Sequence, residues 1–550
     1  MTQRRGSDRV IGVDLGASQA TMAWLQPNGD TRILPNADGE LSTPAVVHFA
    51  NARKVTVGRR ALEAMADDPE HVAFAAKRGM GDQHYRRMLG DRRYTPPLIV
   101  GVLLRKLMAD AELAMNAPVG GVVLTLPSWF NELQRQATQV AARMADVPVV
   151  DVINEPTAVM LAHAWRTWRG REEHAQIREA GNPTQQALRN VAVIDIGAGG
   201  FDATLFAVEG RSIRAIAADG DQTLGGMEWD YQVADRIAAA LKAGGAADLR
   251  ELPARWDQLL TAVEPARRML TDAEKADCQL TFGKQSRKVA LSRKNVDAWT
   301  DALIYRLERR LNQLVRGGKM LWGQVDQVIV VGGATRMPRV QEKIEAVVHH
   351  TLDTSIRDEH PVARGAAIYG GMCMTDGRPR VMLDAGFVPA SEAGLRVMTY
   401  APAVETLLRG ALVRNVSGHS LGVMVNTKEG KRNAVVLPRQ STLPAGRDQR
   451  FTTYVNDQEF LRVIVLEGEA ESADDCTPIA LCDVGPLPKG LPAGSPVSVR
   501  LGYDHSGRLQ VDILETTNLQ AADMTFRPDL VTEPSAIAMA RQVLENIEIK

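Results

Sequence analysis

Short apolar runs alternate with longer amphipathic stretches over the first two-thirds of the 550-residue chain. Apolar runs with the character of strands occur at 10–15, 120–126, 191–195 and 325–333. Apolar residues with helical spacing occur at 131–145, 156–168 and 296–317. Strands that alternate with long helices are typical of α/β folds. The pattern therefore predicts an α/β domain, which we place at 1–395.

Beyond about residue 415 the pattern changes to short segments with period-two alternation. Turn-forming clusters such as PKGLPAGS and DHSGR separate these segments, which is typical of an antiparallel β-sandwich. We therefore expect a sandwich at 416–519. We expect a linker at 396–415, preceded by an irregular insertion from about 372, and a short helical tail at 520–550.

The overall composition is that of an ordinary globular protein, with 45% hydrophobic residues, 24% charged residues and a formal net charge of −1. This balance gives no electrostatic case for binding nucleic acid or a membrane surface. No run reaches the roughly 18 apolar residues of a membrane span, and the N-terminus lacks the apolar segment of a signal peptide. We therefore expect a cytoplasmic protein without membrane or nucleic-acid partners.

The four cysteines form no C-x-x-C pair, which suits a reducing compartment. Cys476 and Cys482 are separated by five residues and leave a zinc half-site as an alternative, although no histidine-rich segment lies near them.

Two glycine-rich loops share one design. In VIGVDLGASQATMAWL (10–25) and VAVIDIGAGGFDATLF (191–206), an apolar strand ends in Asp14 or Asp195, and a glycine loop leads into a return strand. Backbone N–H groups of such loops can cradle phosphate oxygens, while the carboxylates can hold Mg²⁺ and its waters. One such loop alone is commonly a plain hairpin turn. Two of them predict related half-domains that face each other across a cleft.

Two further glycine pairs follow, Gly225 and Gly226 in GDQTLGGMEWD and Gly332 and Gly333 in VIVVGGATRMP. The second pair follows a strand and fits a strand-to-helix nucleotide contact. Each pair taken singly is equally well explained as a tight turn.

A series of ordered blocks resembles the seventy-kilodalton heat-shock chaperones of the DnaK type, over nearly all of residues 9–519. The blocks are IGVDLG (11–16), PNADGELSTPAVVHF (35–49), FAAKRGMGD (74–82), LTLPSWFNELQRQAT (124–138), INEPTAVMLAH (153–163), DIGAGGFD (195–202), GDQTLGGMEWD (220–230), VVGGATRMPRVQ (330–341), DEHPVARGAA (358–367), SLGV (420–423), TLPAG (442–446) and VLEGEAESADD (465–475). So many blocks in one order are far more specific than any single loop.

The resemblance implies an actin-like, duplicated ribonuclease H-like ATPase domain of two lobes, followed by a β-sandwich that binds extended peptides. It implies ATP or ADP with Mg²⁺ as cofactors. Asp14 and Asp195 would serve Mg²⁺ through water, Lys77 would contact the phosphates and the attacking water, and Glu155 would help to position that water. Read alone, Lys77 could be a surface lysine, and Glu155 could simply cap the helix that follows.

The resemblance also assigns the remaining nucleotide contacts. The phosphate-side residues are Gly16, Ala17, Ser18, Gly197, Ala198, Gly199, Gly200, Gly225, Gly226, Gly332 and Gly333. The adenosine-side residues are Glu264, Arg267, Arg268, Thr271, Arg336 and Asp358.

The phosphate loops depart from the family pattern. Ala17 and Ser18 stand where the family usually has two threonines, and Ala198 and Gly200 replace a glycine and a threonine. Two hydroxyls expected near the γ-phosphate are therefore missing. A hydrogen bond to a charged group contributes about 1.5–3 kcal/mol, so each loss would slow hydrolysis by roughly 10- to 150-fold. We expect ATP binding with slow hydrolysis.

The residues that couple the domains are partly altered. Pro127 and Arg135, which resemble the interdomain relay, are kept. Asp151 stands where the DnaK type has a basic residue for docking J-domain co-chaperones, and Asn415 replaces the aspartate that ends the linker. A reversed charge would repel an acidic partner, so the usual J-domain docking is in doubt, while a nucleotide-exchange factor stays a possible partner.

The resemblance places Val423, Phe451, Tyr454, Leu461 and Val463 in a groove for unfolded or extended client peptides. The alternative from periodicity is that they form the sandwich core. Because the lid that normally follows is truncated, we expect fast peptide exchange.

The leading hypothesis is an ATP-dependent chaperone, an enzyme that hydrolyses ATP slowly. The alternative is a nucleotide-binding scaffold or co-chaperone without turnover. A sugar kinase or filament-forming protein of the actin-like fold would share the phosphate loops, but the sandwich and the INEPTA block speak against it.

Overall fold

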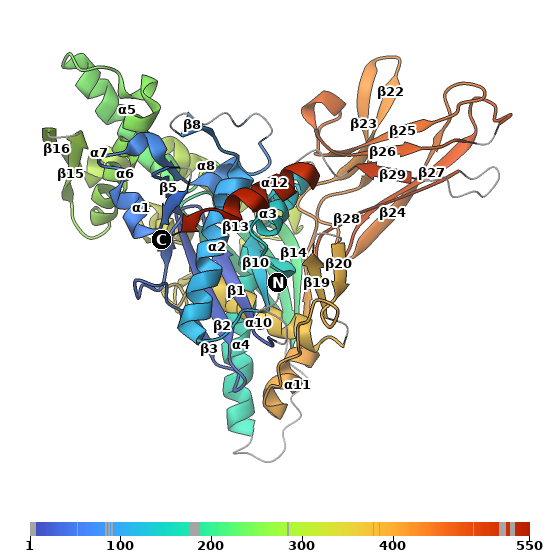
Figure 1. The fold of residues 1–550 in the computed structure, drawn as a ribbon, viewed down its shortest axis with the longest axis horizontal. Helices are drawn as coiled ribbons and strands as arrows, with labels where there is room; N and C mark the ends of the chain where they lie inside the picture. Colours follow the sequence, from blue (N-terminus) through green and yellow to red (C-terminus); the bar gives the residue numbers. More distant parts are fainter. Residues whose placement is uncertain are drawn as a thin grey trace.

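The computed structural model describes residues 7–549 apart from 52, 83–84, 86–87, 90–91, 176–187, 283–284, 378, 384–385, 488, 516–523 and 528–533. Two large sheets form the centre of its N-terminal α/β region (Figure 1). The first has the order β20-β19-β11-β10-β1-β2-β3, with β4 beside β2. The second has the order β18-β17-β12-β13-β14-β21. We call the parts of the chain built on them the first lobe and the second lobe.

The strands of the first sheet are β1 (Val10–Leu15), β2 (Gln19–Leu25), β3 (Thr31–Leu34), β4 (Thr43–Pro44), β10 (Gly121–Leu126), β11 (Val149–Asn154), β19 (Arg380–Leu383) and β20 (Gly386–Pro389). Those of the second are β12 (Arg189–Ile196), β13 (Phe201–Glu209), β14 (Ser212–Asp221), β17 (Gln327–Val331), β18 (Leu352–Asp353) and β21 (Leu412–Arg414). The order β11-β10-β1-β2-β3 returns as β18-β17-β12-β13-β14, with matching parallel and antiparallel pairs. The chain thus contains two related halves, as its two glycine loops predict.

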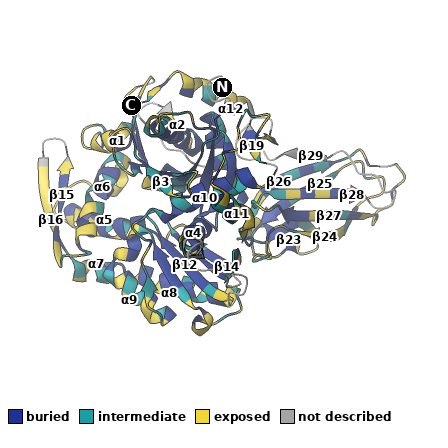
Figure 2. Ribbon diagram, turned by 90° about the horizontal axis from the view of Figure 1, so that it is seen from below, coloured by how far each residue is buried: buried dark blue, intermediate teal, exposed yellow. Residues whose placement is uncertain are grey.

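Helices cover both sheets and lie between them. α4 (Glu155–Ala175) and α10 (Pro361–Thr375) fill the space between the sheets in one apolar cluster. α2 (Pro96–Met115) and α3 (Glu132–Met144) cover the outer face of the first sheet, and α8 (Asp301–Gly317) and α9 (Pro338–Val348) cover that of the second. The central strands are buried on both faces, which explains their continuous apolar runs (Figure 2).

A smaller subdomain stands on each lobe. The first lobe carries β5 (Val46–Phe49), β6 (Lys54–Val57), β7 (Val72–Phe74), α1 (Arg59–Glu63), the short pair β8 (Met88–Leu89) and β9 (Arg92–Arg93), and the 3₁₀ turn η2 (Ala76–Gly79). The second lobe carries α5 (Gly226–Ala243), α6 (Pro253–Met269), α7 (Arg293–Trp299) and the hairpin of β15 (Lys275–Phe282) and β16 (Gln285–Ser292). The hairpin exposes much of its length (Figure 2).

The C-terminal β region is a sandwich of two antiparallel sheets that projects from the lobes (Figure 1). One sheet has the order β23-β22-β25-β26-β29, and the other β24-β27-β28. The strands are β22 (Leu421–Thr427), β23 (Gly430–Leu437), β24 (Ala445–Thr452), β25 (Leu461–Glu467), β26 (Thr477–Val484), β27 (Pro496–Tyr503), β28 (Leu509–Glu515) and β29 (Met524–Arg527). Because β29 pairs with β26, the sandwich extends into the segment 520–550 that we assigned wholly to a helical tail.

The segment 372–414 is not the irregular insertion that its proline and glycine content suggests. β19 and β20 add to the first sheet, and α11 (Pro402–Gly410) packs on α10. Val404, Leu407 and Leu408 are buried, since their i, i+3, i+4 spacing places them on one helical face. Within the predicted linker, Leu412–Arg414 forms the strand β21, which pairs with β14 of the second lobe.

The C-terminal helix forms where its amphipathic pattern predicts, as α12 (Pro534–Glu545). It does not cover the sandwich but lies against the first lobe (Figure 1), where Ile537, Leu544 and Ile547 join the same apolar cluster as β1 and β10. β30 (Glu548–Ile549) then pairs in parallel with β6. In the part of the chain that the structure describes, no helix combines the length and apolarity that crossing a membrane requires.

Candidate functional site

A cleft of about 1000 Å³ opens between the two lobes. Both glycine loops line it, as do most of the residues predicted from the sequence. These are Asp14, Gly16, Ala17, Ser18, Lys77, Pro127, Glu155, Asp195, Gly197, Ala198, Gly199, Gly200, Gly226, Glu264, Arg267, Arg268, Thr271, Gly332, Gly333 and Arg336. The two loops also touch directly, because a Cβ atom built on Gly199 would lie 2.7 Å from that of Ala17.

Carboxylates and one ammonium group gather where the two loops meet. The Nζ atom of Lys77 donates to Oε1 of Glu155 at 2.6 Å, and both side chains are largely buried. Burial raises the pKa of Asp14 to about 7, with the Glu155 carboxylate as a second cause. Burial also raises the pKa of Asp195 well above its ordinary value, helped by Glu155 and Asp14. When ionised, the carboxylates of Asp14, Asp195 and Glu155 carry more negative charge than the single Lys77 ammonium can offset.

This donor set fits Mg²⁺. Magnesium prefers a few carboxylate ligands together with retained water, and a bound cation favours the ionised form of acids whose pKa is raised by burial. Asp14 and Asp195, which end the equivalent strands β1 and β12, are the residues that could hold it.

Arginines gather at the part of the cleft lined by α6 and the turn before α9. Nε of Arg267 lies 2.6 Å from Asp230, and Nη1 of Arg268 lies 3.2 Å from Glu264. Arg336 pairs with Asp358. Asp358 is 69% exposed and is not among the described residues that line the cleft, but it contacts Arg336, which does; its own contact with the nucleotide stays a prediction.

Gly225 also differs from its prediction. It supports the phosphate loop instead of lining the cleft, because a Cβ atom at 225 would lie 2.3 Å from the backbone nitrogen of Gly200. Only glycine allows the start of α5 to approach the loop so closely.

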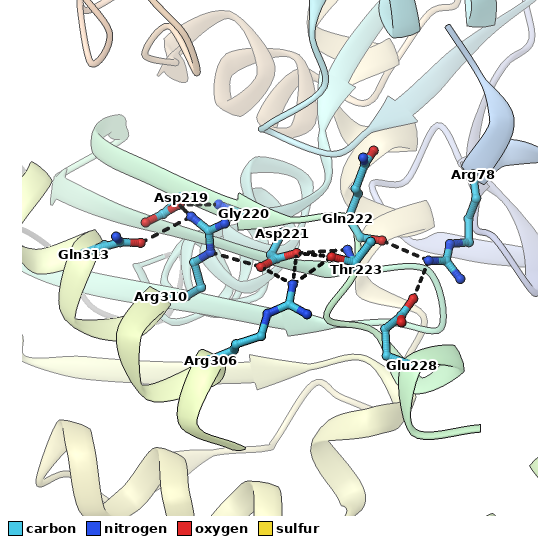
Figure 3. A network of polar contacts seen from close by, with 10 residues as sticks. All are labelled: Arg78, Asp219, Gly220, Asp221, Gln222, Thr223, Glu228, Arg306, Arg310 and Gln313. Carbon is cyan, nitrogen blue, oxygen red and sulfur yellow. Dashed lines mark hydrogen bonds and ion pairs between the residues drawn. The ribbon is translucent and has the colours of Figure 1, made fainter. Parts of the chain in front are cut away.

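Several cleft residues were not predicted from the sequence, among them Arg78, Trp129, Phe130, Asp202, Gln222, Arg357 and His360. Arg78 follows Lys77 in the first lobe and crosses to the second, where it contacts the Glu228 carboxylate and the Gln222 carbonyl (Figure 3). Arg306 and Arg310 of α8 hold the adjoining end of β14 through Asp221 (Figure 3). A signal was present, because the blocks that match the family contain Arg78, Trp129, Phe130, Asp202, Gln222 and His360.

The predicted coupling residues lie where the lobes meet the sandwich. Nη2 of Arg135 donates to Oδ1 of Asn154 at 2.9 Å, and Pro127 lines the cleft. The hydroxyl of Thr157 donates to Oδ1 of Asn415 at 2.6 Å, so the residue that replaces the linker aspartate is bound to α4.

Asp151 is buried and faces the sandwich. It accepts hydrogen bonds from the Ser506 hydroxyl at 2.7 Å and from Nη2 of Arg508 at 3.2 Å. The Arg508 guanidinium also lies 3.4 Å from the ring centroid of Phe387 on β20. The reversed charge at 151 therefore has a basic partner within the same chain.

The predicted groove residues are divided in their exposure. Val423 and Val463 are buried in the sandwich core, and Phe451 and Leu461 pack against it half-buried. Tyr454 is 87% exposed at the outer end of the sandwich. For Val423 and Val463, core packing is thus at least part of their role.

Comparison with known proteins agrees with this architecture. A sequence model of the Hsp70 protein family matches residues 10–391 and 403–548. The chain is 28% identical over 511 residues to the chaperone protein DnaK of Thermosipho africanus, and covers 77% of that protein with 91% of its own length. It is also 28% identical over 516 residues to the chaperone protein DnaK of Thermotoga neapolitana, with the same coverage. The chain therefore belongs to the Hsp70 family.

Proposed function

We propose that the protein is an ATP-dependent chaperone of the DnaK type that hydrolyses ATP slowly. Mg²⁺ and ATP would bind in the cleft between the lobes, and extended apolar peptide segments would bind to the sandwich. The observation that carries the proposal is the cluster of Lys77, Glu155, Asp14 and Asp195 at the meeting point of two glycine loops.

The cluster has the parts that phosphoryl transfer requires. Catalysis of this reaction rests on positioning and on electrostatic stabilisation of the transferred group. Mg²⁺ bound by Asp14 and Asp195 would supply positive charge beside the phosphates. The Lys77 ammonium would interact with the negative charge of the same phosphates. Glu155, whose carboxylate lies 2.6 Å from that ammonium, would orient Lys77 and a water molecule.

The glycine loops support binding more strongly than cleavage. Gly197 and Gly333 line the cleft, and a Cβ atom added at either would meet nothing within 4 Å, so the chain leaves open space there for a phosphate. Ala17 and Gly200, in contrast, offer no hydroxyl to the γ-phosphate. The second candidate function, a nucleotide-binding scaffold or co-chaperone without turnover, draws its support from these two residues.

Contacts across the domain boundary support a chaperone in which nucleotide and sandwich communicate. Asp151, Asn415 and the strand β21 join the sandwich side to both lobes. A J-domain that uses a basic residue at position 151 would find instead an acid already paired with Arg508.

A single-turnover assay with γ-labelled ATP and Mg²⁺ tests the proposal. Release of labelled phosphate above the buffer rate, together with nucleotide-dependent binding of an apolar peptide, is expected. ATP binding without phosphate release would overturn the ATPase and leave the scaffold. Absence of ATP binding would overturn both functions.

A further inference from the structure

Trp129 lies at the junction of the two lobes, directly after β10. Its neighbour Ser128 is held by Asp202 of β13, which accepts from the Ser128 backbone N–H at 2.6 Å and from its hydroxyl. The indole is thereby placed against the second lobe, at the floor of the cleft.

The indole packs where β13 begins and β14 ends. A Cβ atom at Gly220 would lie 1.7 Å from Cδ1 of Trp129, so only glycine at 220 leaves room for the ring. Gly220 is paired with Asp202 across the β13–β14 ladder, and the next pair joins Phe201 to Asp221. The ring therefore covers the end of the hairpin to which the phosphate loop is attached.

The same ring limits what can stand at position 200 of the phosphate loop. A Cβ atom there would lie 2.9 Å from the carbonyl oxygen of Asp221, 3.2 Å from Cα of Gln222 and 3.3 Å from Cζ2 of Trp129, so the ring restricts this position together with the backbone. The backbone of Gly200 does not itself demand glycine, because its φ lies outside the left-handed region. A larger residue is restricted by these neighbours, of which Asp221 and Gln222 lie at the end of β14, where the indole packs on Gly220.

Aromatic surface also lines this part of the cleft. Trp129 and Phe130 form an edge-to-face pair with centroids 5.1 Å apart, and the Lys77 ammonium lies 5.6 Å from the centroid of Phe130. The Nε1 atom of Trp129 is buried without a hydrogen-bond partner among the described residues.

We propose that Trp129 is a positioning residue that keeps the phosphate loop free of a side chain at position 200 and thereby sets a slow rate of cleavage. The inference rests on the proposed function, since it concerns the cleavage step in the same cleft. It makes Trp129 and Gly200 a matched pair: a hydroxyl at 200 becomes useful only when the ring at 129 is smaller.

Four proteins test the pair: the wild-type chain, Trp129→Phe, Gly200→Thr and the double variant. Melting temperatures are measured without nucleotide, and ATP dissociation constants and single-turnover cleavage rates with Mg²⁺. Gly200→Thr alone should lower Tm by a few degrees, because overpacking is destabilising, and the double variant should recover most of this loss. Gly323→Thr, at a site where an added Cβ meets nothing within 4 Å, measures the general cost of the substitution.

The kinetic readout separates a positioning role from a structural one. The double variant should cleave bound ATP roughly 10- to 150-fold faster than the wild-type chain, because a hydroxyl next to the γ-phosphate hydrogen-bonds the charge in the transition state. Its dissociation constant for ATP should stay within about threefold of the wild-type value, so that the change falls on the cleavage step.

Two outcomes overturn the inference. In one, Gly200→Thr alone is as stable and as fast as the double variant, so that the ring does not restrict position 200. In the other, Tm shows the coupling but the double variant cleaves no faster than Trp129→Phe. Loss of ATP binding by the wild-type chain would instead refute the proposed function, while the coupling in Tm would still be measurable.

Discussion

Asp151 of the first lobe and Arg508 of the sandwich form an ion pair of 3.2 Å across the domain boundary. The Asp151 side chain is 12% exposed and that of Arg508 28%, so the pair is largely shielded from solvent. Ser506 and Tyr369 also donate hydrogen bonds to the Asp151 carboxylate. The acid that sequence comparison identifies as a charge reversal is therefore part of the interface that holds the sandwich to the lobes.

Exchanging the two charges should preserve the interface, whereas changing one should open it. Asp151→Arg places two guanidinium groups together and should weaken docking by about 2 kcal/mol. This cost is near the lower end of the range for breaking a buried ion pair, because Arg508 is partly exposed. Asp151→Arg combined with Arg508→Asp should recover most of that loss. Small-angle X-ray scattering and limited proteolysis measure docking. Arg500→Asp, at an exposed pair within the sandwich, is the control and should have little effect.

Lys77 should be required for cleavage more than for binding. Lys77→Ala removes the ammonium that Glu155 holds in the cleft and should slow single-turnover hydrolysis by roughly 100- to 1000-fold. Lys343→Ala, which breaks an ion pair on α9 outside the cleft, is the matched control and should cleave at the wild-type rate. Cleavage by Lys77→Ala at an unchanged rate would remove Lys77 from the chemistry.

Local sequence patterns predicted much of the candidate site. Asp14 and Asp195 end continuous apolar runs, and such runs predict strands that are buried on both faces. The glycine loops follow within a few residues, so the phosphate-side residues could be identified without tertiary information. The pKa values of Asp14 and Asp195 could not be predicted in this way, because they depend on how the two halves of the chain bury the carboxylates together.

Long-range packing decided what the sequence could not reveal. Arg508 lies 357 residues from Asp151, and no local pattern joins them. The insertion holds β19, β20 and α11, whose short length and flanking proline and glycine residues conceal their periodicity. Trp129 stood inside a matched block, but its effect on Gly200 depends on contact between the two lobes.

Docking of the sandwich should weaken as the pH rises from about 4.5 to about 8. Burial raises the pKa of Glu132 to about 8, with the neighbouring Glu467 carboxylate as a further cause and with Gln136 and Arg135 acting in the opposite direction. Glu467 accepts from the Glu132 backbone N–H at 2.7 Å and from the Tyr503 hydroxyl, so the two acids meet at the interface. Because the pKa is raised above its ordinary 4.5, the stability is fully present below about pH 4.5 and is lost as the pH rises through 8.

Glu132→Gln tests this dependence. The variant cannot ionise, so its docking and Tm should fall less between about pH 5 and 8 than those of the wild-type chain. Glu405→Gln, at an exposed pair on α11, controls for the loss of a surface charge. Equal slopes for Glu132→Gln and the wild-type chain over this range would show that Glu132 does not titrate at the interface.

Leu544 should be as important to the first lobe as a residue of its central strands. Its side chain is fully buried, it lies 3.4 Å from the position of a Cβ atom at Gly101 of α2, and its carbonyl accepts from Arg105. Leu544→Ala should reduce the free energy of unfolding of this lobe by about 2–5 kcal/mol. Met539→Ala, 62% exposed on the same helix, should change it by less than about 0.5 kcal/mol.

Unfolding in denaturant, followed by intrinsic fluorescence with and without ATP, measures the free energy of unfolding of both variants. If Leu544→Ala proves as stable as Met539→Ala, α12 does not pack on the lobe in solution and is free to act as a remnant lid. If it is destabilised as expected, the sandwich is anchored at both ends, through β21 in the second lobe and through α12 and β30 in the first. Because the cleft lies between those lobes, opening or closing it would then move the two anchors relative to each other. Nucleotide would thus act on the sandwich through these two anchors.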